Sequence, residues 1–90
     1  MKTLDAKALR MLISVVHCGS IRSAAEQEQV AASVVSRQIS EIEKNIGLPL
    51  FNRTSRGVGL TDAGQLVFEH AQRVLEDSVL LSEQLDQFRS

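Results

Sequence analysis

The sequence is poor in aromatic residues and in cysteine. Its 90 residues include three phenylalanines but no tryptophan or tyrosine, so a core has to come from Leu, Ile, Val and Ala. The single cysteine, Cys18, excludes an internal disulfide and fits a reducing cytoplasm. No apolar run approaches the roughly 20 residues of a membrane-spanning helix, and no signal peptide is indicated. We therefore expect one small cytoplasmic domain, not a membrane or disulfide-rich protein.

The residue patterns of catalytic and metal sites are also missing. His17 and Cys18 are neighbours, so on a helix they point apart, and no third or fourth ligand lies at metal-binding spacing. The stretch Gly57-Val58-Gly59 is not followed by a helix with a Lys-Ser/Thr pair, as a phosphate loop would be. No nucleophile has a base beside it. We expect no enzyme activity, no metal site and no cofactor.

Charge is unevenly distributed, although the net charge is only −1. Residues 1–60 contain eight Lys or Arg and five Asp or Glu, whereas residues 61–90 contain two basic and six acidic residues. Exposed charges more than about 8–10 Å apart are largely screened at physiological salt, so a basic head can bind phosphate beside an acidic tail. The charge pattern permits nucleic-acid binding without establishing it.

The spacing of apolar residues predicts two helices in the first third of the chain. In residues 4–17 apolar side chains follow an i, i+1, i+4, i+5, i+8 pattern, which is typical of a helix. Gly19 suits the left-handed end of that helix, and Ser20 suits the N-cap of the next. The second helix is short, about 21–28, and its adjacent alanines let another helix approach closely.

A third helix is predicted after a turn near residues 29–32, and it ends at Gly47 with Pro49 just beyond. Its apolar face consists of Val35, Ile39, Ile42 and Ile46. The opposite face carries Ser33, Ser36, Arg37, Ser40 and Lys44. One side is thus suited to a core and the other to solvent or a polar partner.

The rest of the chain predicts a hairpin and a long helix. Two short extended stretches, 50–53 and 58–60, flank a polar turn that contains glycine. Thr61 then caps a helix that runs to about residue 88. We expect a mainly α fold: a winged helix-turn-helix of three helices and a two-stranded β wing, followed by a long C-terminal dimerisation helix.

The third helix and the hairpin have features needed for reading DNA. A helix in the major groove, about 12 Å wide, needs an apolar back and an outer face of short donors and basic side chains. Arg37 could donate two hydrogen bonds to guanine or to a phosphate. Arg56 at the wing tip and Arg53 at its base could enter the adjacent minor groove. An ordinary solvated helix shows a similar outer face, but its combination with a preceding helix and a wing favours DNA binding.

Four segments in this order resemble one family. GSIRSAAE at 19–26, VSRQI at 35–39, IGLPLFNR at 46–53 and LTDAG at 60–64 look like the LysR-type transcriptional regulators. The resemblance covers about residues 4–88. It implies a winged helix-turn-helix DNA-binding domain at 1–60, with the helix-turn-helix at about 20–39 and the wing at about 50–60. Residues 61–90 would be a linker helix that dimerises.

The resemblance implies that Ser36, Arg37, Arg56 and Thr61 contact DNA. With residues around them added, the predicted DNA-binding set is Arg22, Ala32, Ser33, Ser36, Arg37, Ser40, Arg53, Arg56 and Thr61. The partner is double-stranded DNA. The recognition helix would lie in the major groove and the wing in the minor groove.

The sequence departs from the family where the recognition helix begins. The family has a Ser-Gln-Pro-like tripeptide there, and this chain has Ala31-Ala32-Ser33. Ala32 cannot form the hydrogen bonds of a glutamine to adenine, so readout of that base is lost or replaced by apolar contact with a thymine methyl. Ala31 is a poor N-cap, worth about 1 kcal/mol less than serine. We expect Ser33 to take over the cap, so that the helix starts two residues later.

The long helix carries an apolar stripe with coiled-coil spacing. Steps of four and three residues connect Val67, Ala71, Val74, Ser78, Leu81, Leu85 and Phe88. A helix of this length reaches about 40 Å, too far for a 60-residue head to cover. We expect a homodimer through residues 62–88 that meets an interrupted inverted repeat, with packing against a downstream domain of the same chain as the alternative.

Two functions fit these patterns. The first is sequence-specific DNA binding in transcription regulation. The second is a winged-helix module that dimerises through its long helix and binds only protein. In the resembled family a ligand-sensing domain follows the linker helix. We expect any small-molecule inducer to bind that domain, which these 90 residues do not include.

Overall fold

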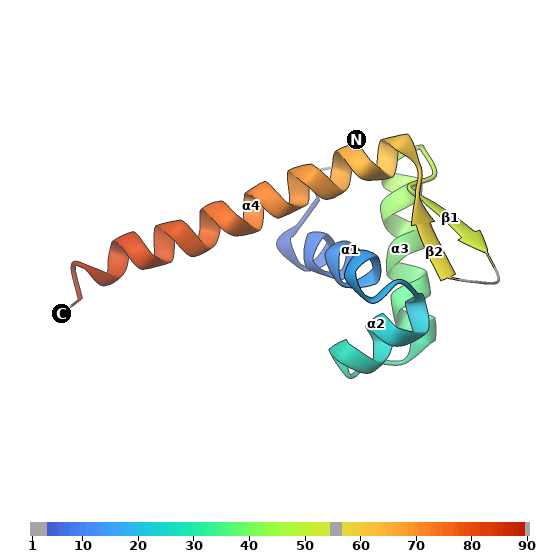
Figure 1. Ribbon diagram of the computed structural model, residues 1–90, viewed down its shortest axis with the longest axis horizontal. Helices are drawn as coiled ribbons and strands as arrows, with labels where there is room; N and C mark the ends of the chain where they lie inside the picture. Colours follow the sequence, from blue (N-terminus) through green and yellow to red (C-terminus); the bar gives the residue numbers. More distant parts are fainter. Residues whose placement is uncertain (1–3, 55–56, 90) are drawn as a thin grey trace.

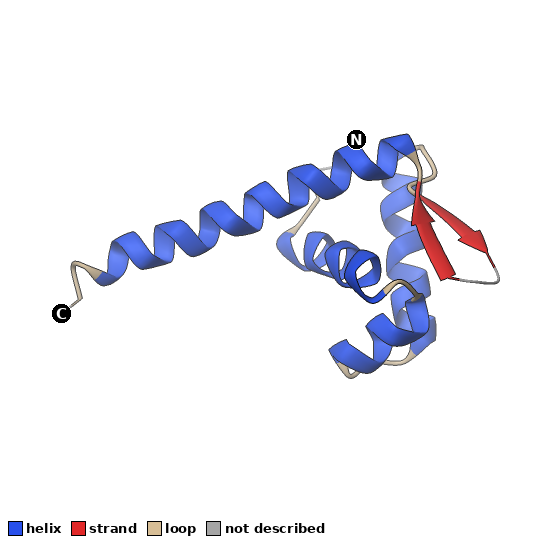
Figure 2. Ribbon diagram, viewed as in Figure 1, coloured by secondary structure: helices blue, strands red, loops and turns tan. Residues whose placement is uncertain are grey.

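The computed structural model describes residues 4–54 and 57–89, with the backbone alone at residues 53 and 54. In chain order the elements are α1 (Ala6–Cys18), α2 (Ile21–Glu28), α3 (Ala32–Ile46), β1 (Phe51–Thr54), β2 (Gly57–Leu60) and α4 (Asp62–Asp86). Figure 1 shows that α1–α3 and the hairpin form a head, from which α4 projects as an arm. Figure 2 shows a mainly helical chain with one two-stranded sheet. These elements confirm the predicted winged helix-turn-helix fold.

Local signals account for most helix ends. The Asp5 carboxylate accepts a hydrogen bond from the Ala8 N–H at 2.7 Å, which caps α1. The Ser20 hydroxyl accepts one from the Ser23 N–H at 3.0 Å and starts α2 as predicted. Gly19 ends α1 in the left-handed conformation that its sequence position indicated.

The predicted start of α3 was wrong. Its N-cap is Ala31, which makes no side-chain capping bond, and the first helical residue is Ala32. Ser33 therefore lies inside the helix and does not cap it. The Ala31 carbonyl already accepts hydrogen bonds from Val34 and Val35, at 3.0 and 3.4 Å. Val35 is fully buried, so packing fixes the helix start two residues earlier than a Ser33 cap would and compensates for the missing capping bond.

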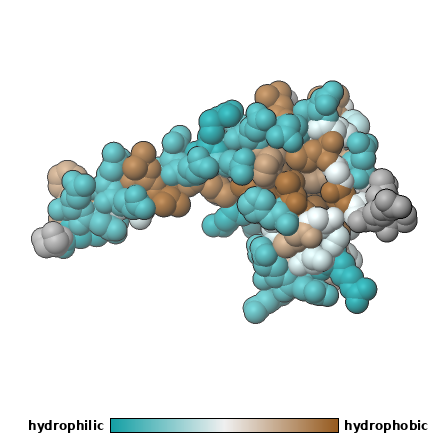
Figure 3. All heavy atoms as spheres, in the orientation of Figure 1, coloured by the Kyte–Doolittle hydropathy of each residue, from teal (hydrophilic) through white to brown (hydrophobic). Residues whose placement is uncertain are grey.

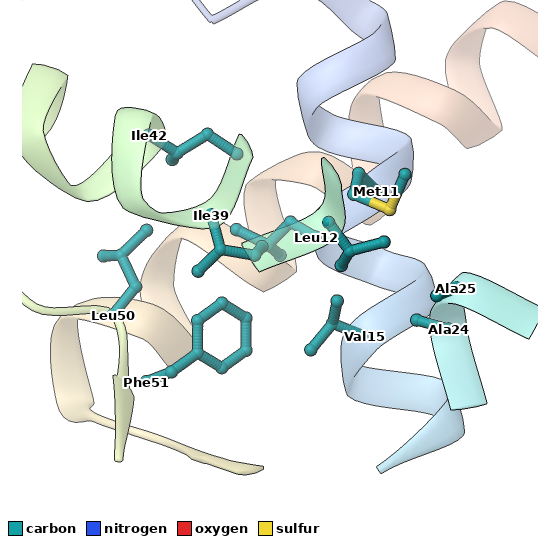
Figure 4. Close-up of a cluster of buried hydrophobic side chains, with 10 residues drawn as sticks. Met11, Leu12, Val15, Ala24, Ala25, Ile39, Ile42, Leu50 and Phe51 are labelled. Carbon is teal, nitrogen blue, oxygen red and sulfur yellow. The ribbon is translucent and has the colours of Figure 1, made fainter. Parts of the chain in front are cut away.

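The core lies where the three short helices meet the base of the wing. Figure 4 shows side chains from each of these elements pointing toward one another. The buried cluster consists of Met11, Leu12 and Val15 from α1, Ala24 and Ala25 from α2, Val35, Ile39 and Ile42 from α3, Leu50 just before the hairpin, and Phe51 at the start of β1. Aliphatic residues and alanine dominate it, as the shortage of aromatic residues required.

The first half of α4 packs along α1, and its second half leaves the head. Ala71 is fully buried, Val67 and Phe68 are partly buried against the core, and the His17 and Phe68 rings meet edge to face at 5.9 Å. From Glu76 onward every described α4 residue is exposed. Within 4–54 and 57–89, no helix combines the length and apolarity that crossing a bilayer requires.

Candidate nucleic-acid interface

The buried back of α3 determines which of its side chains face outward. Val35, Ile39 and Ile42 are at most 5% exposed, so the opposite side of the helix is turned to solvent. The exposed residues of α3 are Ala32, Ser33, Arg37, Ser40, Glu41 and Lys44, and we call Ala32, Ser33, Arg37, Ser40 and Lys44 the outer face of α3. This face has the combination of short polar and long basic side chains predicted for major-groove binding. Ser36, also in the predicted set, is half-buried at its edge.

Arg22 also lies at the surface, on the helix that precedes the turn. Its side chain is 89% exposed, and its Nε atom is 3.6 Å from Glu26 Oε1, one helical turn away. An exposed pair of this kind contributes at most about 1 kcal/mol, so the guanidinium remains available for exchange onto a phosphate. The predicted contact of Arg22 with DNA remains a prediction.

The wing is a short antiparallel hairpin beside α3. Its register pairs Phe51 with Leu60 at the base and Thr54 with Gly57 toward the tip. Arg53 is in β1 opposite Val58, and its backbone alone is described. Arg56 lies outside the described residues. The predicted minor-groove contacts of these two arginines therefore stay predictions.

The outer part of the wing is attached to the helix-turn-helix. The Val58 N–H donates to the Gly19 carbonyl, in the corner between α1 and α2, at 3.0 Å. Gly57 has a φ of +131°, a conformation that side chains rarely adopt, and a Cβ there would collide with the same carbonyl oxygen. The absence of a side chain thus lets β2 lie directly on this corner.

Thr61, a predicted DNA contact, uses its hydroxyl within the chain. Its Oγ1 accepts from the Gly64 N–H at 3.0 Å, which caps α4, and donates to the Pro49 carbonyl at 2.8 Å. The Thr61 N–H donates to the Leu50 carbonyl at 3.0 Å. These bonds connect the wing base to α4, and the predicted contact of Thr61 with DNA stays a prediction.

Sequence reasoning missed Glu43, which lies on the side of α3 nearest the wing. Its Oε2 atom accepts hydrogen bonds from the N–H groups of Leu50 and Phe51, at 2.7 and 3.2 Å. No motif indicates this contact in advance, because the acceptor and its donors are seven and eight residues apart and the turn between them determines the geometry.

The predicted dimer residues divide into two groups along α4. Ala71 has to be corrected: it is fully buried by its own chain and has no surface left for a partner. Val67 and Val74 are half-buried, whereas Ser78 is exposed and its hydroxyl donates to the Val74 carbonyl. The large apolar residues exposed toward the C-terminus are Val79, Leu80, Leu81, Leu85 and Phe88. Val79 lies on the other side of the helix from Leu81, so we call Leu80, Leu81, Leu85 and Phe88 the C-terminal stripe.

A second apolar surface lies where α4 meets the head. An open hollow of about 540 Å³ there is lined mainly by apolar side chains, among them Leu48 and Leu66, which are 53% and 68% exposed. Figure 3 shows apolar surface both along α4 and in the angle between α4 and the head.

Within the described part of the chain, no three His, Cys, Asp or Glu side chains are grouped so that they could hold a metal ion.

Comparison with known proteins agrees with this geometry. The family model of the bacterial regulatory helix-turn-helix protein, lysR family, matches residues 6–65. The chain is 42% identical over 77 residues to the transcriptional regulator CrgA of Neisseria meningitidis serogroup B, covering 86% of this chain and 25% of CrgA. It is 34% identical over 85 residues to the transcriptional activator TtdR of Escherichia coli K12, covering 94% and 27%. The chain thus spans about a quarter of the length of these curated relatives.

Two solved DNA complexes have the same fold. The DNA-binding domain of CbnR in complex with DNA superposes with a TM-score of 0.86 at 28% identity, covering 97% of this chain and all of that one. The DNA-binding domain of BenM on benA site 1 DNA gives a TM-score of 0.90 at 28% identity, covering 97% and 98%. With the family model matching more than half of its residues, this chain belongs to the lysR family of bacterial regulatory helix-turn-helix proteins.

Proposed function

We propose that this chain is the DNA-binding part of a transcription regulator that acts in the cytoplasm. The outer face of α3 would lie in the major groove and the wing in the adjacent minor groove. The observation that carries this proposal is the exposure of Ser33, Arg37 and Ser40 on a helix whose back is locked into the core. The CbnR and BenM domains, which share this fold, were crystallised on DNA.

The placement of charge supports DNA as the partner. Residues 1–60, which contain the winged helix-turn-helix, carry a net positive charge, whereas α4 carries the acidic excess. Arg37 and Lys44 lie two helical turns apart on the same face, so both can approach one duplex. Phosphate contacts of this kind hold a protein in register, and short side chains such as Ser33 and Ser40 then meet the base edges.

We further propose that the protein works as a homodimer through α4. The C-terminal stripe exposes four large apolar side chains on an arm that its own head leaves uncovered. Burying them against a second copy would remove this surface from water, at about 25 cal/mol per Å². Two linked heads would meet the two half-sites of an interrupted inverted repeat. A small-molecule inducer would act through a part of the regulator that these residues do not contain.

Selection of duplexes from a random pool tests the DNA proposal. We expect an interrupted inverted repeat with thymine at the base pair facing Ala32, because an exposed methyl can contact the thymine C5 methyl but cannot hydrogen-bond adenine. Ala32→Gln is expected to shift that position to adenine. The matched control is Ala6→Gln, since Ala6 is also the exposed first residue of a helix. Failure to enrich any sequence would contradict sequence-specific binding.

Replacing Leu81 with aspartate tests the dimer. Leu81 is 55% exposed in the middle of the C-terminal stripe, so the variant should fold normally but lose association. Burying an unpaired carboxylate in an apolar seam costs several kcal/mol, which predicts a rise in the dimer dissociation constant of about 100-fold or more. Sedimentation equilibrium measures it. Glu83→Gln, an exposed change on the same arm, should leave the dimer intact. Equal effects of both would argue against the stripe as the interface.

A further inference from the structure

Glu43 connects the recognition helix directly to the wing. Its Oε2 atom accepts from the Leu50 and Phe51 N–H groups at 2.7 and 3.2 Å, and its own carbonyl accepts from the Gly47 N–H at 2.8 Å, where α3 ends. Leu50 and Phe51 are 1% and 7% exposed. One residue therefore contributes both to ending α3 and to holding the start of β1.

Side-chain packing joins these two elements at the base of the wing, where Leu50 and Phe51 share the buried core with α3 side chains. The main neighbours of α3 are α1 and α2, whereas β2 packs on α1 and α4. Residues 47–50 alone separate α3 from the hairpin, and Leu48 among them is exposed. The position of the wing relative to α3 therefore depends on the packing at its base together with direct hydrogen bonds, and the two that Glu43 accepts connect the wing base to the recognition helix itself.

We infer that Glu43 is a positioning residue for DNA recognition. By holding the wing base against α3, it sets the separation between the base pairs under the outer face and the minor-groove stretch under the wing. This inference rests on the proposed DNA binding. A charged acceptor suits the role, because charge-assisted hydrogen bonds to backbone N–H groups are shorter and stronger than neutral ones.

A fixed separation has a measurable consequence. Moving an A·T-rich minor-groove tract by one base pair displaces it by about 3.4 Å along the duplex and rotates it by about 35°. A wing held by Glu43 cannot follow both the displacement and the rotation of the tract, so affinity for the altered duplex falls. A wing released from α3 can adjust, so affinity depends less on where the tract lies.

The experiment compares dissociation constants for two duplexes, measured by fluorescence anisotropy. One is the selected site, and the other has the A·T tract moved by one base pair. The natural chain should discriminate by about tenfold, comparable to the cost of a mismatched base pair, and Glu43→Ala should reduce this ratio to about threefold or less. Glu43→Gln should keep most of the discrimination, because its amide oxygen still accepts from both N–H groups.

Asp5→Ala is the matched control. It removes a carboxylate that accepts a backbone N–H at 2.7 Å, as Glu43 does, but at the start of α1. It should change stability while leaving the discrimination ratio unchanged. All titrations are run below the thermal transition of each variant. Glu43→Asp, which draws the acceptor back by one methylene, takes the place of the alanine variant where that variant unfolds.

Three results would overturn the inference. Glu43→Ala could weaken both duplexes by the same factor, which would indicate a purely structural role. The natural chain could bind both duplexes equally, so that no separation is fixed. Absence of binding to any duplex would defeat the proposed function itself, and this outcome is distinguishable because the natural chain would then fail along with its variants.

Discussion

Replacing Gly64 with alanine is expected to lower the free energy of unfolding by about 3 kcal/mol, the cost of forcing a side chain into a packed site. Gly64 is buried in the first turn of α4, where that helix crosses the wing base. A Cβ there would collide with the Leu50 carbonyl oxygen and lie 2.9 Å from Leu60 Cδ2. For a chain of this size the expected fall in Tm is about 12–24 °C, measured by circular dichroism.

Gly59→Ala is the control for this change. Gly59 is an exposed glycine in β2, and a Cβ there would meet nothing within 4 Å. We expect its effect on the free energy of unfolding to stay within about 0.5 kcal/mol. Within a helix, alanine is more favourable than glycine by about 1 kcal/mol. At Gly64 the free-energy cost of the steric collision therefore has to exceed this gain for the variant to be destabilised. A stable Gly64→Ala variant would show that α4 does not approach Leu50 as closely as described.

Replacing Arg37 with alanine is expected to cause the largest loss of DNA affinity among single changes on α3. Arg37 is exposed near the centre of the outer face, on the side of α3 opposite the fully buried Val35. A bidentate arginine–guanine pair contributes about 1–3 kcal/mol of discrimination, which corresponds to roughly 5- to 150-fold in Kd. Titration against the selected duplex and against one with that base pair changed measures both affinity and specificity.

Arg89→Ala controls for the loss of one positive charge. Arg89 lies beyond the end of α4, paired with Asp86 at 2.7 Å, far from the outer face of α3. Its removal should change Kd little and leave base preference intact. An Arg37→Ala variant that lost no more affinity than Arg89→Ala would remove α3 from the interface.

The sequence predicted features whose signals lie within a few residues. The sequence predicts the second helix at 21–28, and the structure has it at Ile21–Glu28, where Ser20 caps its start and Gln29, in the left-handed conformation, ends it. Periodicity also predicts the outer face of α3, since the apolar residues that face the core recur every three or four positions along the helix. Such features depend on local geometry that a linear pattern records directly.

Features that depend on packing between distant segments could not be read in this way. Ala31 looked too poor a cap to start α3, but burial of Val35 outweighed the missing hydrogen bond. Ala71 fitted a dimer stripe, and only the course of α4 along α1 shows that its own chain covers it. The roles of Glu43 and Gly64 depend on where the wing returns to the helices, and this position is set by the whole fold.

Titration of the chain with its selected duplex at 50 and 200 mM salt tests the central claim most directly. If six to ten phosphates are neutralised across the interface, affinity should fall by about 10³–10⁵-fold between these concentrations. A protein-interaction module would bind the duplex at neither concentration. Affinity that is undetectable at low salt, or the same at both, would contradict an α3 surface built for DNA.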